Sequence, residues 1–276
     1  MTTYIQLLEE GKKILEVAGI VEAKLDAWYL LSDTFSINRT QFLMERNRPK
    51  ELEPALLEQY RKRLKKRAMR IPLQHILGVQ EFMGIEFIVN NKVLIPRQDT
   101  EVLVEEVLKE KTGTVLDLCT GSGCIAISLA KLGSFQQVDA ADISVDALDI
   151  AKKNAERAEV QVQFYQGNLF ETITKKYDII VSNPPYIPKE VIKTLEPEVK
   201  KYEPYQALYG PNNGLYFYEK ISESAVNFLN SNGKIFYEIG YDQAEAVYDI
   251  LEKYKYKEIT VIPDLSGKNR VVKARR

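Results

Sequence analysis

The spacing of hydrophobic and polar residues changes about one third of the way along the chain. Up to about residue 75, hydrophobic residues recur every three or four positions, which is typical of one face of a helix. From Thr114 onward, short apolar runs alternate with stretches of helical spacing. This pattern predicts a helical bundle followed by an α/β domain, whose mostly parallel sheet is covered by helices on both faces.

Four helices are expected in the bundle, which takes up residues 1–75. The first ends near Gly19, Thr40 caps the third at residues 41–46, and Pro54 occupies the first turn of the fourth. The apolar faces of the first, second and fourth helices carry Ile5, Leu8, Leu15, Leu25, Trp28, Leu31, Leu57, Tyr60 and Leu64.

Residues 76–95 are predicted to form a linker that contains a β-hairpin. Residues 79–82 and 85–89 are expected to pair as strands around a turn at Met83-Gly84. The α/β domain then covers residues 96–276, and it opens with a helix for which Asp99 is the expected N-cap.

The α/β domain is expected to contain seven strands. They are predicted at residues 114–118, 137–141, 160–165, 177–182, 234–239, 257–262 and 269–274, with the main helices at 124–132, 144–157, 214–231 and 242–254. The loop between the last two strands, residues 263–268, is too short for a helical crossover, so this pair is expected to be antiparallel.

Composition narrows the class of protein. The formal net charge of −1 provides no basic field that would draw the chain to nucleic acid or anionic lipid. The start carries no signal-like stretch and no apolar run reaches membrane-spanning length, so we expect a cytoplasmic protein. The two cysteines, Cys119 and Cys124, lie in one loop and are expected to be reduced thiols. A sole histidine, His75, argues against a His-based metal site or a Ser/His/Asp triad, and no metal is expected.

A run of basic residues lies in the last helix of the bundle. Charge runs usually form a solvated face, and this is the favoured interpretation. The alternative is a docking surface for an acidic partner or RNA. The residues are Arg61, Lys62, Arg63, Lys65, Lys66, Arg67 and Arg70.

The most informative segment is Asn183-Pro184-Pro185-Tyr186, which directly follows the apolar run at residues 177–182. The prolines fix φ at about −65° and donate no N–H, so nearby carbonyls can point outward without a helical partner. The side-chain carbonyl of Asn183 adds a further acceptor beside an aromatic ring. Such a rigid group of acceptors can hold a planar NH2 group by both hydrogens, which favours chemistry on an amide or an exocyclic amine. A plain proline-rich loop is the alternative.

A second segment, Asp117-Leu118-Cys119-Thr120-Gly121-Ser122-Gly123, follows the first strand of the domain. Its glycines let the backbone approach a ligand closely and enter a helix tightly. Gly121, Gly123 and Ala126 also match the G-x-G-x-x-A pattern of dinucleotide sites, which does not distinguish a nicotinamide cofactor from S-adenosylmethionine. Asp117 favours the latter, because a buried carboxylate repels a pyrophosphate and attracts an ammonium or a sulfonium.

Two further strand ends carry candidate ligand contacts. Asp142 follows the glycine loop by about 20 residues, where a carboxylate can accept the hydroxyls of a ribose; its alternative role is to cap the next helix. Asn168 is expected to bond an adenine edge, and Leu169 and Phe170 to pack on its faces, with plain loop and core roles as the alternatives. All these segments lie at carboxyl ends of predicted parallel strands, where ligands bind in open α/β sheets.

Together these segments resemble the class I S-adenosylmethionine-dependent methyltransferases that act on a planar nitrogen. Three further motifs narrow the resemblance: Gln74-His75-Ile76-Leu77-Gly78 with Glu81-Phe82, Ile95-Pro96-Arg97-Gln98-Asp99-Thr100-Glu101, and Asn269-Arg270-Val271. With the helical bundle, essentially the whole chain is similar to the bacterial release factor glutamine methyltransferase family (PrmC, also called HemK).

The resemblance implies a Rossmann-like fold, S-adenosylmethionine as cofactor and S-adenosylhomocysteine as product. The substrate would be the glutamine of the Gly-Gly-Gln loop of class 1 peptide chain release factors, held in part by the bundle and the hairpin. The protein is expected to act as a monomer and to require no nucleic acid. The implied substrate-binding residues are Asn183, Pro184, Pro185 and Tyr186, of which Asn183, Pro184 and Tyr186 are catalytic. The implied cofactor-binding residues are Asp117, Cys119, Thr120, Gly121, Ser122, Gly123, Asp142, Asn168, Leu169 and Asn183.

Two positions depart from the family pattern, which usually has Gly where Cys119 stands and Pro where Gln98 stands. Because a cysteine would be strained at positive φ, we expect position 119 not to require one. Gln98 lacks the rigid ring that proline would place ahead of Asp99, but this difference removes no catalytic group.

The predicted mechanism is positional, because an amide nitrogen is a poor nucleophile and no strong base is evident. The side-chain oxygen of Asn183 and the Pro184 carbonyl accept the two amide hydrogens and align the nitrogen for in-line displacement, while Tyr186 packs on the amide plane. Three alternatives remain: an amino or amide methyltransferase for RNA, DNA or a ribosomal protein; a nicotinamide-dependent dehydrogenase; and a binding module with an inert Rossmann-like domain.

Overall fold

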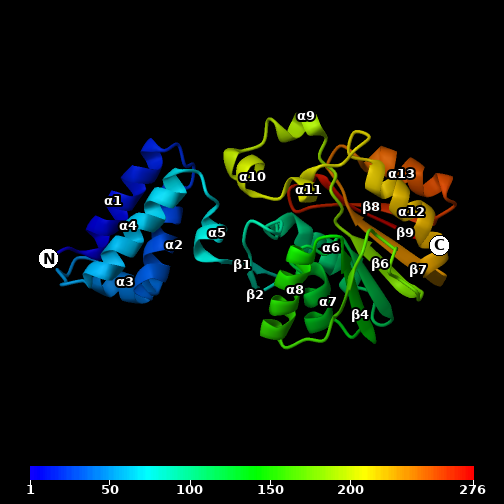
Figure 1. Cartoon of the computed structure of the whole chain (residues 1–276), viewed down its shortest axis with the longest axis horizontal. Helices are drawn as coiled ribbons and strands as arrows, with labels where there is room; N and C mark the ends of the chain where they lie inside the picture. Colours follow the sequence, from blue (N-terminus) through cyan, green and yellow to red (C-terminus); the bar gives the residue numbers. More distant parts are fainter. The chain divides into compact units, whose positions relative to one another are not determined.

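The computed structural model describes all 276 residues and divides into two compact units. The helical unit consists of residues 1–78 together with residues 196–202, and the α/β unit consists of residues 79–195 and 203–276 (Figure 1). The short segment 196–202 therefore belongs to the helical unit, although it lies far from residues 1–78 in the sequence.

The helical unit is built around α1, α2 and α4. Its core is formed by Leu7, Leu15, Leu30, Tyr60 and Leu64, which are fully or almost fully buried. The helices are α1 (Tyr4–Val17), α2 (Ala23–Phe35), α3 (Arg39–Glu45), α4 (Pro54–Ala68), α5 (Leu73–Leu77) and α10 (Pro197–Tyr202). The spacing of apolar residues thus predicted the main helices correctly, but not α5 or α10, which are too short to show a hydrophobic period.

One of the expected caps in this unit is wrong. The third helix begins two residues earlier than its sequence suggested, because Asn38 rather than Thr40 is the N-cap. The side chain of Asn38 accepts a hydrogen bond from the Gln41 N–H, and the Gln41 side chain accepts one from the Asn38 N–H. Pro54 does occupy the first turn of α4, as expected.

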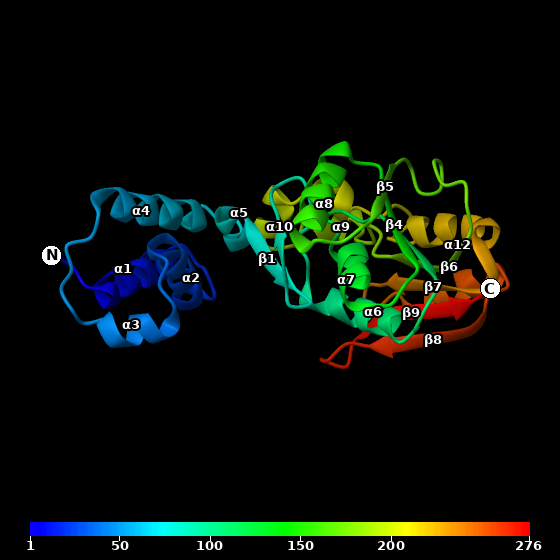
Figure 2. The same ribbon diagram turned by 90° about the horizontal axis from the view of Figure 1, so that it is seen from below.

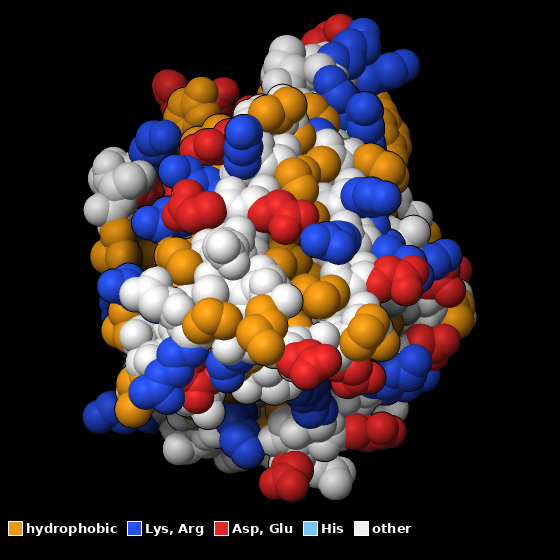
Figure 3. All heavy atoms as spheres, turned by 90° about the vertical axis from the view of Figure 1, so that its left-hand side faces the viewer, with side chains coloured by type: hydrophobic (Ala, Val, Ile, Leu, Met, Phe, Trp, Pro, Cys, Tyr) orange, Lys and Arg blue, Asp and Glu red, His pale blue; other side chains and the backbone are white.

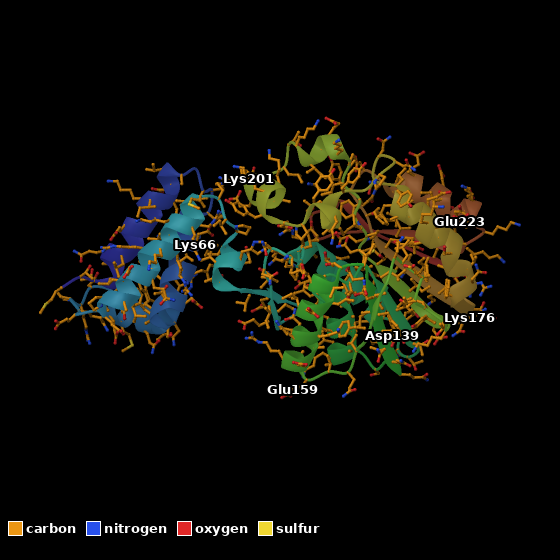
Figure 4. The ribbon with its side chains drawn as sticks, in the orientation of Figure 1. Lys66, Asp139, Glu159, Lys176, Lys201 and Glu223 are labelled. Carbon is orange, nitrogen blue, oxygen red and sulfur yellow. The ribbon has the colours of Figure 1, made fainter.

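The basic run on α4 divides into solvated and structural residues. Lys65 and Lys66 are exposed, and Figure 4 labels Lys66 on α4. Arg67, in contrast, is buried; its guanidinium lies 2.6 Å from an Asp26 oxygen and 2.9 Å from a Glu198 oxygen. Arg70 pairs with Glu196 at 2.6 Å and with Glu198 at 2.7 Å. The solvated-face interpretation therefore fails for these two arginines, which bind the segment that contains α10.

The α/β unit begins with a hairpin of β1 (Val79–Phe82) and β2 (Ile85–Ile88). Met83 and Gly84 have φ values of 51° and 72°, as a tight two-residue turn requires. Helix α6 (Gln98–Leu108) follows, with Arg97 at its N-cap position and no side-chain cap. Asp99 is therefore not the N-cap that the sequence suggested; it lies in the first turn and pairs with Arg270 at 3.0 Å.

The sheet of the α/β unit has seven strands in the order β5-β4-β3-β6-β7-β9-β8. The pairs from β5 to β7 are parallel. β9 is antiparallel to β8, as the short final loop predicted, and it is also antiparallel to β7. The strands are β3 (Thr114–Leu118), β4 (Gln137–Asp142), β5 (Gln163–Gln166), β6 (Tyr177–Ser182), β7 (Leu229–Glu238), β8 (Lys257–Pro263) and β9 (Asn269–Arg275).

Helices cover both faces of this sheet (Figure 2). Because side chains alternate along a strand, Val115 and Val181 pack in the cluster with α6, α7 and α8, whereas Leu116 and Ile180 pack in the cluster with α12 and α13. The remaining helices are α7 (Cys124–Leu132), α8 (Val145–Ala158), α9 (Lys189–Ile192), α11 (Tyr205–Leu208), α12 (Tyr216–Phe228) and α13 (Ala244–Lys253). The expected α/β fold class is confirmed. None of the helices combines the length and apolar character needed to cross a lipid bilayer.

Candidate active site

The candidate site lies where the strand order of the sheet reverses. β3 and β6 are neighbours; β4 and β5 follow on the side of β3, whereas β7, β9 and β8 follow on the side of β6. The loops that leave β3 and β6 therefore diverge, and crevices for ligands form at such points. These loops are the glycine-rich segment and the Asn-Pro-Pro-Tyr segment of the sequence.

A cavity of about 250 Å³ opens at this edge of the sheet. It brings together residues from the ends of four strands. The expected site residues that line it are Cys119, Gly121, Asp142, Asn168, Leu169, Asn183 and Pro185. The expected residues that do not line it are Asp117, Thr120, Ser122, Gly123, Pro184 and Tyr186.

Asp117 lies underneath the glycine loop and is completely buried. Its Oδ2 accepts hydrogen bonds from the Thr120 hydroxyl at 2.6 Å and the Ala126 N–H at 3.3 Å, while Oδ1 is buried without a partner. Burial raises the pKa of Asp117 to about 7. Asp117 therefore holds the loop in shape from below, rather than facing the cavity as the sequence suggested.

The raised pKa of Asp117 predicts a specific pH dependence of stability. The folded state retains a proton that the unfolded state loses above its ordinary value of 3.8, so this group stabilises the fold at low pH and the benefit disappears as the pH rises through about 7. We expect Asp117→Asn, which keeps an acceptor oxygen but cannot ionise, to remove this contribution. The free energy of unfolding of the wild type should fall relative to the variant by about 1.4 kcal/mol per pH unit within this window.

Urea unfolding at several pH values between 4 and 8, followed by far-ultraviolet circular dichroism, measures this difference. Other buried carboxyl groups titrate in both proteins, so their contributions to the free energy of unfolding cancel when the two proteins are compared. A difference between the two proteins that stays constant with pH would contradict the assignment.

Cys119 adopts a left-handed conformation with φ of 62°. The expectation that this position does not require positive φ is therefore wrong. The chain must turn sharply here, because the Thr120 N–H bonds the Ala141 carbonyl on β4 and the Gly121 N–H bonds Asp142. Burial raises the pKa of the Cys119 thiol, which favours the neutral thiol over the nucleophilic thiolate.

Replacement of Cys119 by glycine should relieve this strain. A side chain at positive φ costs roughly 1–2 kcal/mol of stability. Glycine removes this strain, but its greater flexibility in the unfolded chain offsets part of the gain. We expect Cys119→Gly to be more stable than Cys119→Ala by about 1 kcal/mol, because alanine also loses the thiol but keeps the Cβ atom. Chemical denaturation of both variants gives the difference, and equal stability would rule out strain at this residue.

Asp142 connects the loops that follow β3 and β4. One carboxylate oxygen accepts the Gly121 N–H at 2.8 Å, and the other accepts the Ser144 N–H at 2.9 Å. Ser144, and not Asp142, caps α8 through its side chain. Because a carboxylate offers about four acceptor positions, Asp142 keeps free lone pairs at the cavity.

The segment after β5 contributes one polar and one apolar wall. Asn168 and Leu169 both line the cavity. Phe170 instead is buried in the core, where its ring stacks on Phe228 with centroids 4.6 Å apart. The expectation that Phe170 packs on a ligand ring is therefore wrong, and Leu169 is the apolar residue of this segment that reaches the cavity.

The Asn-Pro-Pro-Tyr segment is held from below and from the side. Asn183 Nδ2 donates to the Thr100 hydroxyl at 3.4 Å, and the Tyr186 hydroxyl donates to Glu238 Oε1 at 3.1 Å. Gln243 Nε2 donates to the Tyr186 carbonyl at 3.1 Å. These contacts place the asparagine amide at the wall of the cavity, beside the end of β3.

A glycine makes this close packing possible. Gly214 has a φ of 88°, and a Cβ atom added to it would lie only 2.1 Å from the Tyr186 carbonyl oxygen. Any side chain at this position would displace the backbone of the Asn-Pro-Pro-Tyr segment.

Comparison with known proteins assigns the chain to a family. Residues 6–78 match the PrmC N-terminal domain, and residues 97–196 match the methyltransferase small domain. A release factor glutamine methyltransferase from Geobacter sulfurreducens is 40% identical, over 99% of this chain and 96% of that protein. One from Clostridium botulinum is 39% identical, over 98% of both chains.

The chain belongs to the release factor glutamine methyltransferase family. The resemblance noted in the sequence is thereby confirmed. A crystal structure of a methyltransferase from Pyrococcus furiosus has the same α/β fold, with a TM-score of 0.56, 18% identity, and coverage of 70% of this chain and 90% of that one.

Several residues that line the cavity of this methyltransferase family member were not predicted from its sequence. The cavity is also lined by Lys92, Val93, Leu94, Ile143, Ser144, Pro204, Gln206, Ala207 and Phe217. Most of these lie in irregular segments, where no hydrophobic period indicates which side chains point inward. Thr100 and Glu238, which contact the Asn-Pro-Pro-Tyr segment, were not predicted as site residues either. Thr100 does lie within one of the motifs that resemble the family, whereas the only sequence signal for Glu238 is its position at the end of a strand, β7.

Proposed function

We propose that this protein transfers a methyl group from S-adenosylmethionine to the side-chain amide nitrogen of the glutamine in the Gly-Gly-Gln motif of peptide chain release factors. The observation that carries the proposal is that Asn183 and Pro185 line the same cavity as the glycine-rich loop and Asp142. A site for a methyl donor and a site for a planar amide therefore adjoin one another, in a chain of the glutamine methyltransferase family.

The residues at the cavity suit S-adenosylmethionine. Asp142 has acceptor positions left for ribose hydroxyls, Leu169 and Phe217 offer apolar walls, and Asn168 offers an amide to a purine edge. When bound, S-adenosylmethionine would supply a methyl group that is already activated on a sulfonium: the S–CH3 bond breaks as the N–CH3 bond forms, S-adenosylhomocysteine leaves as a neutral thioether, and the amide nitrogen gives up one of its two protons to water. The protein therefore has to orient the acceptor nitrogen, and no step calls for a metal.

Asn183 and Pro184 are proposed to orient the target amide. The Asn183 Oδ1 atom and the Pro184 carbonyl accept one hydrogen each from the amide NH2 group, which directs the nitrogen toward the methyl group. These acceptors bind the nitrogen more strongly as positive charge develops on it, so they stabilise the transition state more than the ground state. Tyr186 supports the segment through its bond to Glu238, and its ring is proposed to pack against the amide plane.

The helical unit is proposed to bind the release factor. A groove of about 500 Å³ runs between its helices, lined by Leu8, Leu25, Trp28 and Phe42, and the Arg39 guanidinium lies 5.3 Å from the Trp28 ring centre. Viewed from the side of the N-terminus, the surface mixes hydrophobic, basic and acidic side chains without a broad field of one sign (Figure 3). Such a surface suits a protein partner better than a polyanion.

A methylation assay tests the proposal directly. The purified protein is incubated with S-adenosylmethionine carrying a labelled methyl group, with a class 1 release factor, and with the same factor whose Gly-Gly-Gln glutamine is changed to alanine. We expect label on the unaltered factor alone. Label on both factors would place the methylated residue elsewhere. Label on neither, or label on RNA or on a ribosomal protein, would overturn the proposed substrate.

A further inference from the structure

One short connection of the fold holds Tyr186 at both of its ends. The connection runs from the end of β7 to the start of α13, so that only residues 239–242 separate Glu238 from Gln243. The Tyr186 hydroxyl donates to Glu238 Oε1 at 3.1 Å, and Gln243 Nε2 donates to the Tyr186 carbonyl at 3.1 Å. Gln243 belongs to none of the motifs that the sequence singled out, and it has no role in the proposed function so far.

The side-chain amide of Gln243 is held in a single orientation. Gln243 stands at the N-cap position of α13 but does not cap the helix with its side chain, and only 8% of the residue is exposed. Its Oε1 atom accepts the Gly240 N–H at 2.9 Å, whereas Nε2 lies 3.1 Å from the Tyr186 carbonyl and 3.5 Å from the Asn213 carbonyl. Because an N–H can only donate and a carbonyl can only accept, these partners direct the NH2 group toward Tyr186.

Two glycines allow the backbone to approach closely enough for these contacts. A Cβ atom at Gly214 would lie 2.1 Å from the Tyr186 carbonyl oxygen and 2.4 Å from Gln243 Nε2. A Cβ atom at Gly210 would lie 2.7 Å from the Pro185 carbonyl oxygen and 2.8 Å from Tyr186 Cα. The Asn-Pro-Pro-Tyr segment therefore packs directly against backbone on this side, and the Gln243 amide lies in the same narrow space.

The prolines couple the position of Tyr186 to the acceptor that precedes it. Pro184 and Pro185 donate no N–H, so the segment is held through the Tyr186 carbonyl and through the Ile187 N–H, which bonds the Leu208 carbonyl at 2.9 Å. The Pro184 carbonyl belongs to the planar peptide that joins the two prolines, and the ring of Pro185 locks φ of that residue. Few free torsions therefore remain between the Tyr186 peptide and the Pro184 carbonyl.

We propose that Gln243 is a positioning residue, which holds the Tyr186 peptide and thereby directs the Pro184 carbonyl at the target amide. The inference rests on the proposed function, in which this carbonyl accepts a hydrogen of the substrate NH2 group. Gln243 does not line the cavity, so it acts through Tyr186 and not by contact with a ligand. Loss of its NH2 group releases the Tyr186 carbonyl, and the target nitrogen is then no longer aligned with the methyl group.

Gln243→Met of the full-length enzyme tests this role, because methionine has a similar length but no hydrogen-bond donor. We expect kcat on the release factor to fall on the order of 10–100-fold, while the KM for the release factor and the dissociation constant of S-adenosylmethionine change less than about threefold. A kcat within twofold of the wild type would overturn the proposal.

Tyr256→Phe is the control for the loss of a buried hydrogen bond. The Tyr256 hydroxyl donates to the Ser222 carbonyl at 3.1 Å, and Tyr256 directly precedes β8, at the opposite edge of the sheet from the cavity. Urea unfolding should show a loss of stability for this variant, whereas kcat should stay within twofold of the wild type. A fall in kcat equal to that of Gln243→Met would show that the effect follows from general loosening of the unit, and it would overturn the positioning role.

Gly214→Ala disturbs the same contact from the other side. Its Cβ atom has to displace the Tyr186 carbonyl from Gln243, so kcat should fall as it does in Gln243→Met. Gly267→Ala is the matched control, because Gly267 has a similar φ of 80° but nothing lies within 4 Å of an added Cβ atom; its kcat should not change. Since both substitutions break one contact, Gln243→Met should add little to the loss caused by Gly214→Ala. Losses that multiply in the double variant would contradict the proposal.

A measurement without substrate separates this inference from the proposed function. The side-chain amide signals of Gln243 in a 15N-labelled sample are identified by their loss in Gln243→Met. We expect slow solvent exchange of these protons in the wild type and in Gly267→Ala, and faster exchange in Gly214→Ala. Equal exchange rates in the two glycine variants would overturn the role of Gln243, even if the wild type methylates the release factor. The expected rates in an enzyme that fails to methylate it would instead retain the positioning of Tyr186 and reject the proposed substrate.

Discussion

Asn183→Ala is expected to lower kcat on the release factor by about 10²–10³-fold while leaving the enzyme folded. The substitution removes an acceptor that binds the amide nitrogen more strongly in the transition state, and loss of one such preorganised group typically has an effect of this size. Steady-state kinetics with labelled S-adenosylmethionine measure the change. The KM for the release factor should change far less than kcat, because Asn183 is proposed to act mainly on the transition state and not on binding of the substrate.

The control for this prediction is the affinity for the cofactor. Asn183 also lines the cavity, so calorimetry has to show that the cofactor still binds. Asn183→Asp is the matched variant, since it keeps an acceptor at Oδ1 but lacks the NH2 group that Thr100 holds. It should lie between the alanine variant and the wild type. If Asn183→Ala retains kcat within twofold of the wild type, the proposed role of Asn183 is wrong.

Arg67→Met should destabilise the helical unit by about 3–5 kcal/mol. Arg67 is buried between Asp26 and Glu198, and removal of one partner from a buried ion pair leaves an uncompensated charge. Burial raises the pKa of Asp26, against the lowering influence of Arg67, so the loss of the guanidinium should raise that pKa further. Trp28 is the sole tryptophan and lies on α2, so its fluorescence follows the unfolding of this unit in urea.

An exposed arginine of the same helix provides the comparison. Arg61 pairs with Glu10 at 3.3 Å, but both side chains are largely in solvent, and Arg61→Met should cost less than about 1 kcal/mol. A second comparison combines Arg67→Met with Asp26→Leu, which removes the stranded carboxylate and should recover part of the loss. Equal destabilisation by Arg61→Met and Arg67→Met would show that burial does not strengthen the Arg67 interaction.

The regular elements of the α/β unit could be predicted because local signals and tertiary packing agree. α7 begins at Cys124 and ends at Leu132, as expected, since Gly123 and Gly133 flank an apolar run of helical length. The antiparallel pairing of β8 and β9 could be predicted because the loop between them, residues 263–268, is too short for a helical crossover. In contrast, the region of α9, α10 and α11 was missed, because helices of four to six residues are shorter than two helical turns and show no period.

The candidate site was predicted in outline but not in its supporting contacts. Strand ends indicated the positions of Asp142 and Asn183, because parallel strands bring their carboxyl ends to one edge. The contacts of Asn183 with Thr100 and of Tyr186 with Glu238 could not be inferred in this way, since they form only after α6 and β7 have packed. The backbone conformation of Cys119 was predicted wrongly, because a residue with a side chain is expected to avoid positive φ. The hydrogen bonds of the next two N–H groups, to Ala141 and Asp142, instead impose a left-handed turn.

The membership of residues 196–202 in the helical unit has a consequence for protein engineering. The chain passes between the two units three times, after residues 78, 195 and 202. The helical unit, which we propose to bind the release factor, is therefore encoded by two separate stretches of the gene. A chimera joined at residue 78 alone would present the arginines of one parent to the acidic segment of the other, and only parents that match at Glu196 and Glu198 would preserve the ion pairs.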